Sequence, residues 1–180
     1  LPKASFVQIG GGESSEFSPK LALSLGSGIG TSLTVFNHDW FVIPSEGGHS
    51  NMMIEDEFMK DFWSFLKTQG KDEIIVEDFI AGKKGIPQLI SFMSDYFKLS
   101  SPTTDPVELL EQLISKKDTF AVQLFARYCD IIGTVTKNYT LITGAKSVYL
   151  AGGIIPKFLE FFAQSDFRST FEETPSVGKL

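Results

Sequence analysis

The sequence predicts an α/β layer domain, with strands near both ends of the chain and helices between them. Three observations predict it: apolar residues alternate early in the chain, helical periodicity follows, and a short apolar strand comes late. The chain has 180 residues, of which 42% are hydrophobic. That is enough for one sizeable core, and it excludes disorder as the main state.

The early strands are expected between Lys20 and Pro44. Leucines alternate with small residues up to Leu25, glycines interrupt, and an extended pattern resumes over 32–36. A turn at 37–39, in which we assign His38 no role, then precedes a third strand over 40–43. We expect these strands to be antiparallel neighbours, and Ser147–Leu150 to be a buried strand beside them.

Helices are predicted from periodic apolar positions and from their end signals. The expected helices cover residues 54–69, 87–97, a segment starting at Pro106, a long segment from its cap Asp118 to about Thr143, and a segment starting at Pro156. The inner faces are expected to include Ile54, Phe58, Phe62, Phe65 and Leu66; Leu89, Ile90, Met93 and Phe97; and Val107, Leu110, Leu113 and Ile114. Glu55 is expected on a solvated helix face.

Charge and cysteine content exclude several classes of protein. The net charge of −6 disfavours binding to nucleic acid, which needs clustered basic residues. Cys129, the single cysteine, cannot form an internal disulfide, so a reducing, cytoplasmic compartment is expected. No apolar run is long enough to span a membrane. One cysteine and two scattered histidines do not make a convincing metal site.

The first candidate site is the loop Leu25-Gly26-Ser27-Gly28-Ile29-Gly30-Thr31 between two strands. Closely spaced glycines let backbone N–H groups approach an anion, and the hydroxyl of Ser27 or Thr31 can add a donor. The spacing is not that of a Walker loop, and no helix follows as in a dinucleotide fingerprint. A hairpin with a glycine bulge is the alternative.

Three further motifs can carry chemistry. The segment Pro44-Ser45-Glu46-Gly47-Gly48-His49 presents a carboxylate and an imidazole from one turn, and both can hydrogen-bond sugar hydroxyls. The alternative is an ordinary turn with an incidental histidine. Glu77 lies near the start of a short helix, where simple interaction with the helix dipole is the better explanation on its own. Gly152 and Gly153 end the late strand, leaving room for a planar ligand or simply forming a strand-to-helix turn.

In this order and spacing, these motifs resemble the bacterial-type glucokinase family of the hexokinase and actin-like ATPase superfamily. The resemblance also includes Phe6-Val7-Gln8-Ile9-Gly10-Gly11-Gly12 and the long run from Leu150 to Phe162. It implies a ribonuclease H-like fold, a mixed sheet with helices packed on it. It further implies that Gly26, Ser27, Gly28, Gly30 and Thr31 contact ATP phosphates, that Gly152 and Gly153 form the adenosine motif, and that Glu46, His49 and Glu77 bind glucose.

Other parts of the family pattern are absent. The N-terminal phosphate loop and an Asn-Asp pair, whose aspartate is the general base, would belong upstream of Leu1. The chain also ends before the family's last strand and closing helix. We therefore expect residues 1–180 to be the large domain of a glucokinase, without its small domain and extreme C-terminal segment, and inactive in isolation. Asp39, Asp56, Asp61 and Asp78 are interpreted as turn, cap or solvated-face residues and not as the base.

The resemblance implies phosphoryl transfer from ATP to the 6-hydroxyl of glucose, the first step of glycolysis, with Mg²⁺ held mainly by ATP phosphates and water. The alternatives are a sugar-sensing regulator, a kinase for another hexose or for N-acetylmannosamine, and an actin-like nucleotide-binding structural protein. The first would need a basic DNA-binding head, and the last would not need a polar sugar pocket. A homodimer is also expected, because 17 phenylalanines need cover.

Overall fold

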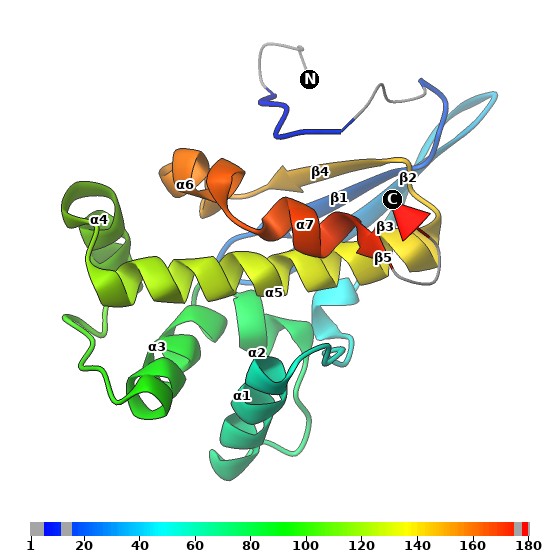
Figure 1. Ribbon diagram of the computed structural model, residues 1–180. Coiled ribbons are helices and arrows are strands. Elements are labelled where there is room, and N and C mark those ends of the chain that lie inside the picture. The colour runs from blue at the N-terminus through cyan, green and yellow to red at the C-terminus, as the bar shows by residue number, and fades with distance from the viewer. Residues whose placement is uncertain (1–5, 12–15, 175–177, 180) are drawn as a thin grey trace.

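The computed structural model describes residues 6–11, 16–174 and 178–179, so Gly12 of the N-terminal motif lies outside the described residues. Its main sheet has the strand order β3-β2-β1-β4, formed by β1 (Lys20–Leu25), β2 (Ile29–Asn37), β3 (Asp39–Ser45) and β4 (Ser147–Ala151). β1, β2 and β3 are antiparallel neighbours, and β4 runs parallel to β1. The predicted mixed sheet with packed helices is confirmed (Figure 1).

The long helix α5 (Thr119–Thr143) lies along one face of this sheet (Figure 1). Leu21, Leu23 and Leu25 of β1 are buried on alternate positions, as their spacing predicts. The Asp118 side chain accepts a hydrogen bond from Ala121 N at 3.0 Å, and Gly144 ends the helix with φ 65°. The predicted start and end of this helix are therefore confirmed by their caps.

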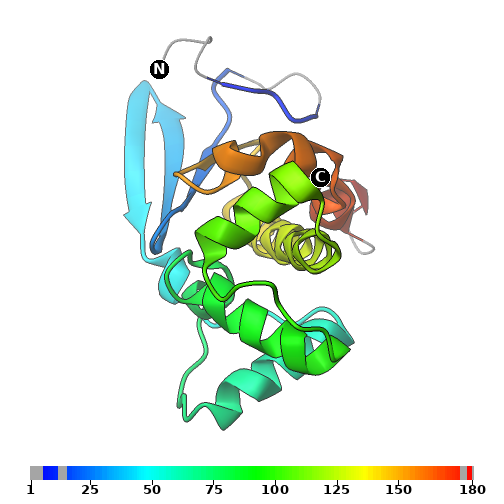
Figure 2. The same ribbon diagram turned by 90° about the vertical axis from the view of Figure 1, so that its left-hand side faces the viewer.

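The helices α1 (Glu57–Thr68) and α3 (Gly85–Phe97) lie on the side of α5 away from the sheet, as Figures 1 and 2 show. Between them in the chain is the short helix α2 (Val76–Ile80), and the others are α4 (Pro106–Lys116), α6 (Leu159–Gln164) and α7 (Phe167–Glu172). The 3₁₀ turns η2 (Gly47–His49) and η3 (Ile155–Phe158) and the short strands β5 (Glu173–Thr174) and β6 (Gly178–Lys179) complete the described elements. Among the described residues, no helix is both long enough and apolar enough to cross a membrane.

Some predicted side-chain positions are wrong. Phe97, Val107 and Ile114 are exposed although their spacing predicted inner positions, and Ile54 is exposed before α1 begins. β4 is half-buried and not buried, because it is an edge strand of the described sheet.

Glu55 is not on a solvated helix face. It precedes α1, and its carboxylate accepts hydrogen bonds from Lys137 Nζ at 2.5 Å and Asn138 Nδ2 at 3.1 Å. Both partners belong to α5, so a distant part of the chain decides where this carboxylate lies. α1 begins at Glu57 because Asp56, whose side chain accepts a hydrogen bond from Met59 N at 2.7 Å, caps it.

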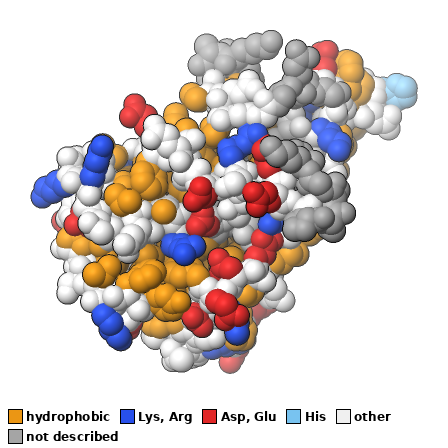
Figure 3. Space-filling model, viewed as in Figure 1, with side chains coloured by type: hydrophobic (Ala, Val, Ile, Leu, Met, Phe, Trp, Pro, Cys, Tyr) orange, Lys and Arg blue, Asp and Glu red, His pale blue; other side chains and the backbone are white. Residues whose placement is uncertain are grey.

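A charged cavity of about 450 Å³ lies where α1 and α7 meet α5, and acidic side chains gather over this region in Figure 3. Asp130, in its wall, lies 3.3 Å from Arg127 Nη1. The pKa of Asp130 is raised to about 6, mainly by burial; Arg127 opposes this rise, and the nearby carboxylates of Asp166 and Asp56 add to it. The ionised form of Asp130 therefore opposes folding at neutral pH.

Replacing Asp130 by Asn should stabilise the chain at pH 7. A carboxyl whose folded pKa is raised favours folding only when protonated, so its unfavourable contribution grows as pH rises from about 4 to about 6. We expect Asp130→Asn to raise the free energy of unfolding at pH 7 by about 1 kcal/mol and to change it little at pH 4. Urea titrations at the two pH values measure this. A variant that is less stable than the wild type at pH 7 would contradict the assignment.

Candidate functional site

The carboxyl ends of β1 and β4 meet at one edge of the sheet, because these two strands are parallel. In open α/β sheets, ligands bind at this kind of edge. Gly152 follows β4 with φ +97°, and a Cβ atom at this position would lie 2.1 Å from the carbonyl oxygen of Leu25. Only glycine fits here, and its close approach brings the Gly152-Gly153 motif against the start of the glycine loop.

The short helix α2 and the turn that follows it are hydrogen-bonded to the glycine loop. Gly82 N donates to Gly26 O at 2.8 Å, and Lys83 N donates to Ser27 O at 3.3 Å. Gly26 N also donates to Gly28 O at 3.0 Å, which closes the loop on itself. These contacts hold the loop in one shape, with Ser27 exposed at its tip.

Glu77 connects α2 to this loop through its side chain. The Ile29 N–H donates to Glu77 Oε1 at 2.9 Å, and the Glu77 side chain is only 12% exposed. Asp78, the next residue, accepts a hydrogen bond from Ile75 N at 3.1 Å and so caps the helix. The capping explanation therefore applies to Asp78, and the Glu77 carboxylate is held against the glycine loop.

The Glu46-Gly47-Gly48-His49 segment forms the turn η2 next to Glu77. A Cβ atom on Gly48 would lie 2.6 Å from Ile29 O and 3.3 Å from Glu77 Cγ, so the turn packs directly on both. His49 Nδ1 lies 3.2 Å from Glu46 Oε2, while the Glu46 side chain is 90% exposed and that of His49 is 59% exposed. The structure thus groups the turn with Glu77, and it leaves the two polar side chains of the turn open to solvent.

Thr31 lies on the side of the loop that faces this turn. Its hydroxyl donates to Ser45 O at 3.0 Å and accepts from Gly47 N at 3.0 Å. Its single proton is therefore engaged within the protein. In this structure Thr31 joins β2 to the turn that carries Glu46 and His49.

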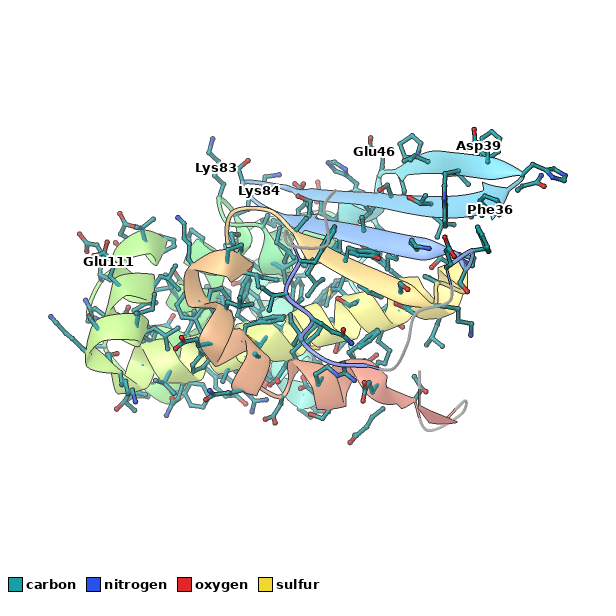
Figure 4. All side chains as sticks on the ribbon, turned by 90° about the horizontal axis from the view of Figure 1, so that it is seen from above. Phe36, Asp39, Glu46, Lys83, Lys84 and Glu111 are labelled. Carbon is teal, nitrogen blue, oxygen red and sulfur yellow. The ribbon has the colours of Figure 1, made fainter. Side chains whose placement is uncertain are left out.

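Lys83 and Lys84, which were not predicted as site residues from the sequence, also lie at the edge where β1 and β4 end. Figure 4 shows Lys83 and Lys84 at the end of the sheet where β1 passes into β2, with Glu46 projecting from the end of β3. Lys84 Nζ lies 3.5 Å from Glu77 Oε2. Their sequence signal is Gly82-Lys83-Lys84-Gly85, two basic residues between glycines shortly after Glu77.

No group of three or more acidic, histidine or cysteine side chains within the described part of the chain could hold a metal ion. One cavity, of about 390 Å³, borders Thr31 and Gly47 behind the Glu46–His49 turn, and another, of about 450 Å³, lies beside α1 and α7; residues 25–30 of the glycine loop line neither of them. We therefore locate the site by its polar groups, which form an open edge, and not by cavity size.

Comparison with known proteins identifies the family. The model of the glucokinase family matches residues 1–180. The chain belongs to the glucokinase family. The glucokinase of Neisseria meningitidis serogroup C is 33% identical over 168 residues, which are 92% of this chain and 51% of that protein. The chain thus spans about half the length of the curated glucokinases it matches.

Solved structures of glucokinases share the fold. The glucokinase of an Antarctic psychrotroph superimposes with a TM-score of 0.86 at 21% identity, covering 97% of this chain and 54% of that one. A ROK-family glucokinase of Streptomyces griseus, solved with glucose and AMPPNP, superimposes with a TM-score of 0.61 at 13% identity, covering 89% of this chain and 53% of that one. The expected hexokinase-like fold of the glucokinase family is confirmed.

The close approach of Gly152 to Leu25 can be tested by substitution. Gly152→Ala should lower the free energy of unfolding by about 2 kcal/mol or more, because it combines an unfavourable φ with a backbone clash. Gly153→Ala is the matched control, since a Cβ atom there meets nothing within 4 Å. It should change the stability by less than about 0.5 kcal/mol. Urea denaturation of both variants measures the difference, and equal effects would refute the close contact.

Proposed function

We propose that the complete protein transfers a phosphoryl group from ATP to the 6-hydroxyl of glucose, and that this chain is its large domain. One observation carries the proposal: Glu77 contacts the glycine loop and also packs against the turn that bears Glu46 and His49. A phosphate-binding element and a sugar-binding element thus share one edge of the sheet. Phosphoryl transfer depends mainly on such positioning of two substrates.

Glu46, His49 and Glu77 are the proposed glucose ligands. A hexose presents several hydroxyl donors around a ring, and carboxylates accept hydrogen bonds from them without offering competing donors. The imidazole of His49 can donate to a sugar oxygen, because its Nδ1 atom lies beside Glu46. The acceptor for the hydroxyl proton is expected to be the aspartate upstream of Leu1.

The glycine loop is the proposed phosphate site. The exposed Ser27 hydroxyl belongs to the residue whose carbonyl accepts from Lys83 N, and the ammonium groups of Lys83 and Lys84 supply positive charge at this edge. Gly152 and Gly153 are proposed to lie along the adenosine. The resemblance implies that Thr31 contacts phosphate. Its hydrogen bonds to Ser45 O and Gly47 N favour a different role, in which Thr31 holds the Glu46–His49 turn in place. Mg²⁺, when bound, would be held mainly through ATP phosphates and water.

The alternatives differ in how much supports them. Membership of the glucokinase family favours a kinase over a sugar-sensing regulator or an actin-like structural protein. A different hexose as the preferred substrate stays an alternative, since the same carboxylates would accept hydrogen bonds from its hydroxyls.

A cytoplasmic location is proposed from the single Cys129. Burial raises the pKa of its thiol to about 12, so this thiol is unreactive.

In the complete protein, Glu46→Ala should raise the glucose KM by about ten- to a hundredfold, because hydrogen bonds to a charged group contribute about 1.5–3 kcal/mol each. His49→Ala and Glu77→Ala should act in the same direction, and the ATP KM should change much less with Glu46→Ala and His49→Ala. Steady-state kinetics with both substrates varied measure these effects.

The control must be a carboxylate outside the site. Glu55 is unsuitable because Lys137 and Asn138 bind it, so we choose Glu111, which is exposed on α4 (Figure 4). Glu111→Ala should leave both KM values unchanged. If Glu46→Ala behaves like Glu111→Ala, the sugar-site assignment is wrong.

The proposed homodimer would cover the edge strand β3. Its residues Trp40, Phe41, Val42 and Ile43 are all exposed, and its outer backbone groups form no ladder within the described residues. Such an edge is ready to pair with another strand. Val42→Lys should therefore shift a dimer to monomer in light scattering, whereas the control Ile114→Lys, also at an exposed apolar position, should not. A wild type that stays monomeric at all concentrations would exclude the dimer.

A further inference from the structure

The carbonyl group of Gly47 is held by a tyrosine from a distant part of the chain. Tyr139, on α5, donates its hydroxyl proton to Gly47 O at 2.5 Å. The Ser50 hydroxyl lies 2.7 Å from the same carbonyl oxygen and 3.1 Å from the Tyr139 hydroxyl, and can donate to either. The centre of the Glu46–His49 turn is thus fixed to a helix that the sequence places 92 residues away.

Several groups besides Tyr139 hold this turn: Gly48 packs on Ile29 and Glu77, and Ser50 N also donates to Gly47 O at 3.0 Å. Thr31 accepts from Gly47 N, so one peptide plane is bound by β2 and the next by α5. The side chains of Glu46 and His49 are mostly exposed, so neighbouring side chains do not confine them. Their positions therefore depend on where the backbone of the turn is held.

An apolar cavity of about 390 Å³ lies behind the turn, between the sheet and α5. Its wall includes Tyr139 and Gly47 together with apolar side chains, among them Leu33, Met52 and Val135. On this side of the turn the space is not filled by side chains, so hydrogen bonds and not packing hold the turn there. Burial also raises the pKa of Tyr139, so its hydroxyl stays a donor throughout the neutral pH range.

We propose that Tyr139 is a positioning residue for the sugar site: by holding the Gly47 carbonyl, it sets where Glu46 and His49 meet the sugar. This inference rests on the proposed function of that turn. It assigns Tyr139 no contact with substrate. On the cavity side the Tyr139 hydroxyl restrains the turn, which would otherwise have more room to move inward.

The test is Tyr139→Phe in the complete protein, which removes the hydroxyl and keeps the ring in the cavity wall. We expect the glucose KM, and the glucose Kd measured calorimetrically without ATP, to rise about three- to tenfold, as for the loss of one hydrogen bond. The ATP KM should stay unchanged. The matched control is Tyr96→Phe on α3, whose hydroxyl lies outside this turn and should leave all three constants unchanged.

A glucose Kd that does not change in a folded Tyr139→Phe variant would overturn the proposal, even if the melting temperature falls. An equal rise in the ATP KM would also overturn the proposal, because it would indicate that the substitution disturbs the whole protein and not the sugar site alone. If Tyr139→Phe does not fold, Ser50→Ala serves instead, with a smaller rise in glucose Kd expected and an unchanged Kd refuting the proposal. Glu46→Ala is measured alongside: an unchanged glucose Kd there would refute the proposed sugar site itself.

Discussion

The contact between α2 and the glycine loop is the interaction on which the site depends. Two backbone hydrogen bonds, from Gly82 and Lys83, fix the turn after α2 to the loop, and the Glu77 carboxylate adds a third from within the helix. Because Glu77 is mostly buried, its charge needs the Ile29 N–H donor and the nearby Lys84 ammonium group. The same contact therefore stabilises a buried carboxylate and places it between the two proposed substrate regions.

α5 supports this arrangement from below the sheet. The hydroxyl of Tyr128 is buried and donates to Ile80 O at 2.8 Å, at the end of α2. Further along the same helix, the hydroxyl of Tyr139 binds the turn that bears Glu46. A single rigid helix thus contacts both segments that carry the proposed sugar ligands, and their relative position follows from the geometry of that helix.

Local signals in the sequence predicted the elements that local interactions determine. Asp118 and Gly144 set the ends of α5, and the alternation of Leu21 to Leu25 set the buried face of β1. The glycine motifs and the Glu46–His49 turn were found because glycine spacing and turn chemistry are visible in a sequence. What could not be predicted depends on distant contacts: Glu55 binds α5, Lys84 reaches Glu77, and Tyr139 reaches Gly47. Phe97 and Val107 have core spacing but are exposed, although the Phe97 ring still stacks on Phe58 of α1.

The parallel pairing of β1 with β4 has a consequence for how the chain folds. β1 pairs with β2 across a short loop, so this pairing can form early. Lys20 of β1 can pair with Ser147 of β4 only after all the intervening helices have been synthesised. Contacts between residues so far apart in sequence close slowly, because a long loop must be ordered first. During synthesis the inner edge of β1 therefore stays unpaired until β4 emerges. The glycine loop and the Gly152-Gly153 motif come together in that step, so the proposed nucleotide side of the site is completed late in folding.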